Sequence, residues 1–171
     1  MDPILDKARA AQNALERLMN SVPGFKGYRE RDLRRDADRL QREHISARLE
    51  DGKKALNQVA NAITRGGDLD VINDVETARK RLDKVANRIR YAERGYSGFF
   101  DAVKVDETVL AKVYQFDMGL IEDVDGVRAA AAAAATAQAG DARTAMQDLI
   151  GRIDALDARL SDRENVLRGV K

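Results

Sequence analysis

Hydrophobic residues recur along most of this chain at alternating steps of three and four positions, which is the spacing of one buried face of an α-helix. Asp2 before Pro3 is a typical helix start, and Pro23 before Gly24 is a typical helix end. The pattern predicts helices over about residues 2–21, 29–64, 71–93, 107–139 and 141–168. The predicted fold class is therefore all-α: an elongated antiparallel bundle of four long helices plus a shorter N-terminal helix, forming one domain over residues 1–171.

The hydrophobic stripe of the second predicted helix changes register in the middle. Its first part consists of Leu33, Ala37, Leu40, His44 and Ala47, and its second part consists of Ile45, Leu49, Gly52, Leu56, Val59 and Ile63. The second set repeats the steps of the first, displaced by one residue. This slip near residues 44–49 indicates that the buried seam changes its partner or its twist there.

Two further patterns concern the connections and the packing of the helices. The "RGGD" break is short, so the second and third helices should form an antiparallel hairpin. The seven alanines at 129–135 favour helix, and we expect them to allow a neighbouring helix to approach closely, with an exposed spacer as the alternative. Gly140 either breaks or kinks the last helix.

The composition excludes several classes of protein. Lys and Arg together number 30 and Asp and Glu 29, so the chain lacks the basic excess of a general nucleic-acid binder. It has no cysteine, which excludes disulfides and cysteine-ligated metals. No apolar run approaches the roughly 20 residues of a membrane-spanning helix, and the N-terminus does not resemble a signal peptide. We expect a cytoplasmic protein that does not bind nucleic acid.

Residues suited to catalysis are scarce. The single histidine, His44, lies on the seam of the second helix, where a structural hydrogen bond is its usual role. No metal-binding, phosphate-binding or dinucleotide-binding motif occurs in the sequence. We predict no enzyme activity and no cofactor. A pocket near His44 and Tyr91, serving a small-ligand carrier or an enzyme, is kept as a second alternative.

The few aromatic residues are concentrated in two glycine-bearing breaks. The chain has four Tyr, four Phe and no Trp, and six of these eight residues lie in or beside "VPGFKGYRER" and "AERGYSGFFDAVKV". Antiparallel pairing of the second and third helices places both breaks toward one end, where the second could run back to Phe25 and Tyr28. The aromatic side chains either plug the end of the bundle or form a binding surface.

Basic residues gather around the same two breaks, in segments 26–35 and 79–94, whereas acidic residues gather in "DMGLIEDVDG". These groups pair with one another, are simply solvated, or bind an anionic partner, which could be an acidic protein segment, a lipid head group or a phosphate. The leading hypothesis is a non-enzymatic helical interaction or scaffold module that binds a protein partner, an acidic one if the basic residues contact it. Its predicted contact residues, within 23–35 and 88–105, are Phe25, Lys26, Tyr28, Arg29, Arg31, Arg90, Arg94, Tyr96, Phe99 and Phe100.

Two other modes of association are compatible with the sequence. The first alternative to a protein-binding module is a peripheral binder of anionic membrane lipid, which is not favoured because no helix shows a bulky apolar face with a lysine-rich rim. Evenly spaced hydrophobic seams also permit a homo-oligomer, in which the alanine-rich helix packs against a second copy.

The segments "PGFKGYRERDLRRDADRLQREH" and "RIRYAERGYSGFFDAVKV" together resemble an uncharacterised group of bacterial helical proteins. The resemblance covers about forty residues. It implies a helical fold and no known activity, so it adds no catalytic or binding residue to those named above.

Overall fold

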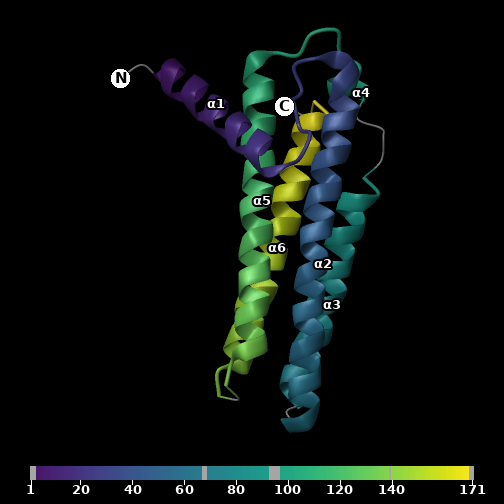
Figure 1. Cartoon of the computed structure of the whole chain (residues 1–171), viewed down its shortest axis with the longest axis vertical. Helices are drawn as coiled ribbons and strands as arrows, with labels where there is room; N and C mark the ends of the chain where they lie inside the picture. The colour runs from purple at the N-terminus through teal and green to yellow at the C-terminus, as the bar shows by residue number, and fades with distance from the viewer. Residues whose placement is uncertain (1–2, 67–68, 93–96, 139, 170–171) are drawn as a thin grey trace. The chain divides into compact units, whose positions relative to one another are not determined.

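The structure is a computed structural model that describes residues 3–66, 69–92, 97–138 and 140–169 (Figure 1). These residues form helices joined by short connections, without a β-strand among them. The elements are α1 (Pro3–Ser21), a 3-10 turn η1 (Arg31–Leu33), α2 (Arg34–Gly66), α3 (Leu69–Arg90), α4 (Ser97–Phe100), α5 (Glu107–Thr136) and α6 (Ala142–Leu167). The predicted class, an all-α helical bundle, is confirmed.

Some predicted boundaries are wrong for identifiable reasons. The second long helix begins at Arg34 rather than at residue 29, because the preceding backbone groups are used in tertiary contacts. The N–H of Tyr28 donates to the hydroxyl of Tyr114, and the carbonyl of Tyr28 accepts from the Arg34 side chain. The four-residue helix α4 is too short to show a hydrophobic period. Gly140 lies in a turn between α5 and α6, so it breaks the helix.

The chain divides into two compact units, each assembled from separate stretches of sequence. The first unit contains Met1–His44, Glu93–Ile121 and Arg159–Lys171, and the second contains Ile45–Ala92 and Glu122–Ala158. The sequence analysis expected one domain. The division within α2 falls between His44 and Ile45, where the hydrophobic stripe was predicted to change its partner or its twist.

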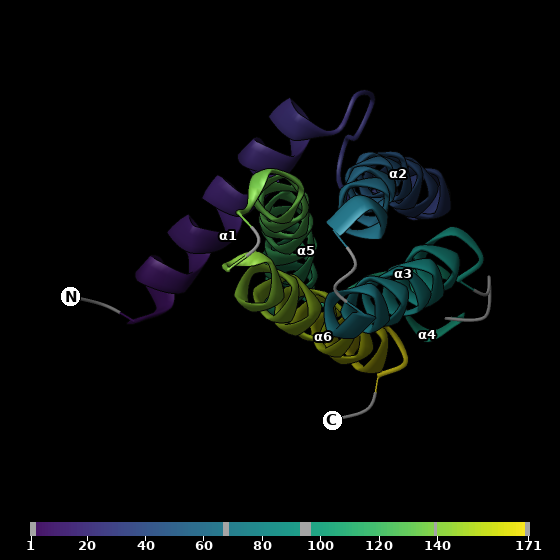
Figure 2. The ribbon, with the colours of Figure 1, turned by 90° about the horizontal axis from the view of Figure 1, so that it is seen from below.

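Interhelical polar contacts define the directions of the helices in the second unit. In successive contacts between α2 and α3, the residue number rises along α2 and falls along α3. This confirms the predicted antiparallel hairpin. In the contacts between α3 and α6, and in those between α2 and α5, the two residue numbers rise together, so these neighbouring helices are parallel. Figure 2 shows the four segments around a ring in the order α2, α3, α6, α5. The contacts between α2 and α3 are Lys53–Asp83 and Asn57–Arg79. Those between α3 and α6 are Arg81–Asp154 and Lys84–Asp157. Those between α2 and α5 are Arg48–Asp125 and Asp51–Arg128.

The buried residues of the long helices follow alternating steps of three and four. In α3 they include Val71, Val75, Ala78, Leu82, Val85 and Ile89. In α6 they include Met146, Leu149, Ile153, Leu156, Leu160, Arg163 and Leu167. The alanine stretch of α5 follows the same rule: Ala130, Ala131 and Ala134 are buried, and Ala132 and Ala133 are exposed. The alanines thus pack along one face, as predicted.

In the first unit, α1 crosses α5 obliquely (Figures 1 and 2). Its last turns bury Ala14 and Leu18. The chain then passes Gly24 and Gly27, whose φ angles of 79° and 89° are in the region that favours glycine. A Cβ at position 27 would lie 2.8 Å from the hydroxyl of Tyr114, so the glycine also permits a close approach.

Replacing Gly27 by alanine should destabilise the protein by at least about 1–2 kcal/mol, because a left-handed backbone and a clash with Tyr114 act together. Chemical denaturation followed by circular dichroism measures this change. The matched control is Gly151→Ala on the exposed side of α6, where a Cβ meets no atom within 4 Å. This control should stabilise the protein by about 0.5–1 kcal/mol. Equal effects of the two substitutions would contradict the proposed role of Gly27.

Candidate functional site

An aromatic cluster in the first unit is centred on Tyr28. Its ring contacts those of Phe25 and Phe99 edge-on, at centroid distances of 5.2 and 5.6 Å, and stacks on Tyr114 at 5.6 Å. Phe100 continues the cluster with an edge contact to Phe99 at 5.2 Å. The predicted meeting of the two aromatic segments is confirmed by the contact of Tyr28 with Phe99. All five rings are buried, which favours the plug interpretation over exposed anchors.

The other predicted contact residues are distributed differently. Tyr96 and Arg94 lie outside the described residues. Arg90 belongs to the second unit, where its guanidinium is 3.3 Å from the carboxylate of Glu50. Sequence analysis missed Tyr114, the third ring against Tyr28, because it lies on a long helix rather than in a glycine-bearing break.

Arg34 joins the two aromatic segments from the first turn of α2. Its side chain is buried and donates to the carbonyl oxygens of Tyr28 and Ala102, both at 2.7 Å, and of Phe99 at 3.2 Å. Its guanidinium carbon also lies 5.9 Å from the centre of the Phe99 ring. Within the described residues it makes no ion pair, so its charge is balanced by backbone carbonyl dipoles and the Phe99 ring. Sequence analysis counted Arg34 as basic but missed this role.

Several charges near the aromatic cluster are neutralised within the protein. Arg29 pairs with Glu107 at 2.9 Å, and the next ion pair, Arg35 with Asp101, is 2.8 Å long. Asp106 accepts the backbone N–H of Thr108 at 2.7 Å, and the N-terminus of α5 offsets part of its charge. This backbone hydrogen bond lowers the pKa of Asp106. These contacts involve all three carboxylates of segment 101–107, which are Asp101, Asp106 and Glu107.

Other cations in segments 22–35 and 97–107 have no carboxylate partner among the described residues. Lys26, Arg31 and Lys104 are exposed and form no ion pair with any residue that the structure describes. The exposed carboxylates of Glu30 and Asp32 are likewise unpaired there. We call Lys26, Arg31 and Lys104 the basic end. Within the described ranges, some carboxylates of segments 22–35 and 97–107 also have no cationic partner. The basic end together with buried Arg34 has more positive charges than these carboxylates have negative ones.

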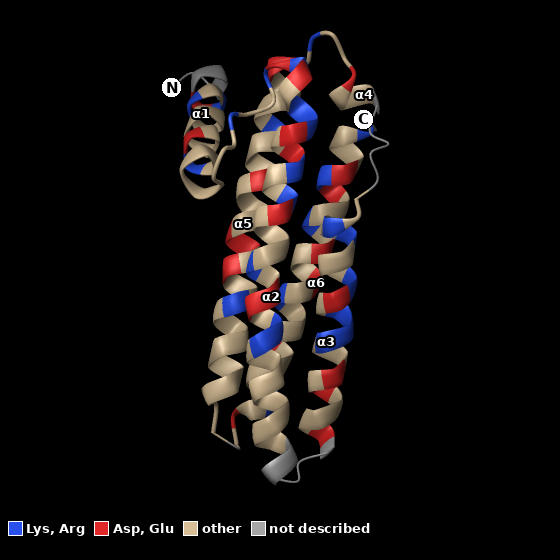
Figure 3. Ribbon diagram, turned by 45° about the vertical axis from the view of Figure 1, so that its right-hand side comes forward, with Lys and Arg blue, Asp and Glu red and all other residues tan. Residues whose placement is uncertain are grey.

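Basic residues of α3 in the second unit pair with acidic neighbours instead. Lys84 lies 2.9 Å from Asp157, and Arg88 pairs with the same carboxylate. Arg81 pairs with Asp154. Figure 3 shows positive and negative residues interspersed along α3. For this part of the predicted basic surface, intramolecular pairing is the better description.

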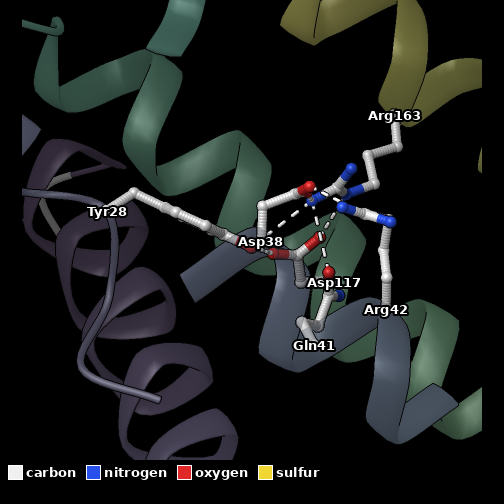
Figure 4. Close-up of polar contacts among 6 residues, drawn as sticks. All are labelled: Tyr28, Asp38, Gln41, Arg42, Asp117 and Arg163. Atoms are coloured by element: carbon white, nitrogen blue, oxygen red, sulfur yellow. Dashed lines mark hydrogen bonds and ion pairs between the residues drawn. The ribbon is translucent and has the colours of Figure 1, made fainter. Parts of the chain in front are cut away.

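A buried polar network lies deeper in the first unit (Figure 4). The Arg163 guanidinium donates to Asp117 at 2.5 Å and to Asp38 at 2.8 Å. The hydroxyl of Tyr28 donates to the second oxygen of Asp117 at 2.5 Å, and Arg42 donates to the second oxygen of Asp38 at 2.8 Å. The network therefore links α2, α5 and α6 to the loop that carries Tyr28.

The network is close to neutral, with the cations Arg163 and Arg42 facing the carboxylates of Asp38 and Asp117. Burial raises the pKa of Asp117, against the opposing effect of Arg163. Burial also tends to raise the pKa of Asp38, but Arg163 and Arg42 outweigh it and hold that pKa below its usual value. Burial, followed by the charge of Asp117, raises the pKa of Tyr28 well above its usual value, so the phenol remains a donor.

The buried helical residues of the network occupy positions at which a hydrophobic residue would continue the buried stripe of its helix. Asp38 and Gln41 are buried and continue the three-four spacing of Ile45 and Leu49 in α2. Asp117 and Arg163 hold the equivalent positions in α5 and α6, between the buried pairs Val113 and Leu120, and Leu160 and Leu167. The predicted first stripe of α2 is therefore partly wrong: Ala37 is buried, Leu40 and His44 are half-buried, and Leu33 and Ala47 are exposed.

Sequence analysis missed the network because it followed hydrophobic residues only. The available signal was the spacing itself: extending the second stripe backwards from Ile45 leads to Gln41, Asp38 and Arg34. A polar residue that interrupts a regular seam is a candidate for a buried, paired group. The network joins three helices, and the side chains of Asp117 and Arg163 are almost wholly buried.

The structure and comparisons with known proteins give three further findings. Across the described ranges, no group of His, Asp and Glu residues could hold a metal ion. None of the helices in those ranges is long and apolar enough to cross a membrane. No protein-family model matches the chain, and no similar curated protein or solved structure is found.

Replacing Arg163 by methionine should reduce the free energy of unfolding by about 3–5 kcal/mol, because two buried carboxylates lose their shared cation. The triple variant Arg163→Met, Asp117→Leu, Tyr28→Phe should recover most of this loss, since Asp38 keeps Arg42 and no buried phenol lacks an acceptor. Urea denaturation of both variants provides the test. A triple variant as unstable as the single one would show that shape, not charge, dominates this site.

The contribution of Asp38 to stability should depend on pH. Because its folded pKa is lowered, the contribution is complete above the unfolded pKa of about 4 and is lost as the pH falls through the folded value. The difference in unfolding free energy between the wild type and Asp38→Asn should therefore shrink between about pH 6 and about pH 3. A difference that stays constant over this range would contradict the assignment of an ionised Asp38.

Proposed function

We propose that this protein is a non-enzymatic helical interaction or scaffold module that binds an acidic segment of a partner protein through the basic end. The observation that carries the proposal is the unpaired positive charge of Lys26, Arg31 and Lys104. These cations lie on segments that Arg34 and the aromatic cluster join. A rigid support of this kind lowers the entropic cost of binding.

The proposal assigns different roles to the aromatic and the basic residues of the original hypothesis. Phe25, Tyr28, Phe99 and Phe100 build the support, since their rings are buried against one another. Exposed cations on the same segments make the contact. Arg29 can join them, because its ion pair with Glu107 is exposed and such pairs contribute only about 0–1 kcal/mol. A carboxylate of the partner can therefore compete with Glu107.

The description as non-enzymatic is supported by the state of the titratable groups. Asp38, Asp117 and Arg163 form a buried set of charged side chains, and such sets are frequent at active sites. Here they are buried and hydrogen-bonded to one another, so a substrate would have to displace the helix contacts that they make. Their arrangement favours a structural role.

The test is a charge reversal at the basic end, Lys26→Glu with Arg31→Glu and Lys104→Glu. Because these side chains are exposed, helicity should be retained. Affinity for fluorescently labelled poly-L-glutamate at low salt should fall by about tenfold or more, since three favourable contacts become repulsive.

The matched control reverses Lys7, Lys80 and Lys112, which are also exposed and without an ion pair among the described residues. This control changes the net charge equally and should keep most of the affinity. Equal losses in the two triple variants would mean that poly-L-glutamate responds to net charge alone, and the basic end would not be a site. Binding of anionic vesicles but not of poly-L-glutamate would favour the lipid alternative.

A further inference from the structure

The loop between α4 and α5 is fixed at both ends. On one side, Arg34 donates to the carbonyl of Ala102 at 2.7 Å and Arg35 pairs with Asp101 at 2.8 Å. On the other side, Asp106 accepts the N–H of Thr108 at 2.7 Å. Val103 lies between these anchors and is 85% exposed. The protein thus holds an aliphatic side chain in solvent on an ordered loop.

A second exposed aliphatic side chain lies on segment 22–35, which also carries Lys26 and Arg31 of the basic end. Leu33 is 37% exposed at the end of η1, whose turn is closed by its N–H donating to the carbonyl of Glu30 at 3.1 Å. The next residue, Arg34, reaches the carbonyl of Ala102, which precedes Val103. One arginine side chain therefore connects the residue after Leu33 to the residue before Val103.

Cations accompany both aliphatic side chains. Lys104 follows Val103, and Arg31 precedes Leu33 by two residues; both belong to the basic end. A complementary segment would place carboxylates against the cations and an apolar side chain against Val103 and Leu33. Protein contacts commonly have an apolar centre and a polar rim, and this arrangement matches an aliphatic side chain with cations beside it.

We propose that Val103 and Leu33 are the apolar anchors of the basic end, and that the partner segment carries bulky aliphatic or aromatic side chains between Asp or Glu residues. This inference rests on the proposed function. It favours a peptide over a membrane surface, because two aliphatic side chains are too few for an interfacial face. Glu30 and Asp32 beside Arg31 would also repel a flat anionic bilayer, whereas a peptide can avoid them.

Two synthetic peptides of equal length and charge provide the test: one alternates Glu with Leu, and the other alternates Glu with Ser. Fluorescence anisotropy measures their binding to the full chain. The Leu peptide should bind the wild type about tenfold more tightly than the Ser peptide. In the variant Val103→Ser with Leu33→Ser, this preference should disappear, while affinity for the Ser peptide stays unchanged.

The control variant is Met19→Ser with Tyr91→Ser, which removes two other apolar side chains that are 50% and 71% exposed. It should keep the preference for the Leu peptide. Should Leu33→Ser impair folding, Val103→Ser alone, at an almost wholly exposed position, should still lower the preference severalfold.

The other outcomes separate the two proposals. If the wild type binds both peptides equally and the charge reversal abolishes binding, the apolar anchors are wrong and the proposed function stands. If neither peptide binds, both proposals fail. If Val103→Ser weakens binding to vesicles of phosphatidylserine and phosphatidylcholine but not to the Leu peptide, the surface is a lipid contact, and the inference is overturned.

Discussion

The ion pair between Arg163 and Asp117 determines the arrangement of the first unit. Arg163 brings α6 against α5 through Asp117 and against α2 through Asp38, and Asp117 holds the loop by accepting the hydroxyl of Tyr28. A buried pair of this kind adds little net stability, because both ions lose their hydration. Removing one partner is nevertheless costly, because it leaves the other charge buried and unpaired. Arrangements of α2, α5 and α6 that separate these groups are therefore strongly disfavoured. We infer that the network specifies one packing of this unit.

Tyr28 connects the buried network to the segments at the surface. Its hydroxyl belongs to the network, its N–H donates to Tyr114, and its carbonyl accepts from Arg34. Arg34 in turn holds the carbonyl of Ala102, next to the exposed Val103. The exposed cations and aliphatic side chains of the proposed contact are therefore connected to the buried ions through a continuous set of hydrogen bonds. The segments that carry them are held by hydrogen bonds within the first unit.

The sequence predicted the helices well where hydrophobic residues repeat regularly, as in α3 and α6. It also predicted that the two aromatic segments would meet, from glycines and chain reversal. It was wrong where a local rule competes with a distant contact: the first stripe of α2 was drawn through Leu33 and Ala47, which are exposed. The slip near residue 44 marks the place where the seam becomes polar. Extending the seam backwards would have found Asp38 and Gln41.

The sequence by itself determined the helical class, most helix limits and the turns at its glycines, because these depend on neighbours within a few positions along the chain. Only the tertiary structure decided which charges are buried and paired and which remain exposed. Arg163 and Asp117 are 46 residues apart, and the spacing that places Arg163 on the buried face of α6 does not say which carboxylate it meets. Which side chains meet depends on how helices are placed side by side, so the unpaired cations of the basic end emerge only when every pair is known.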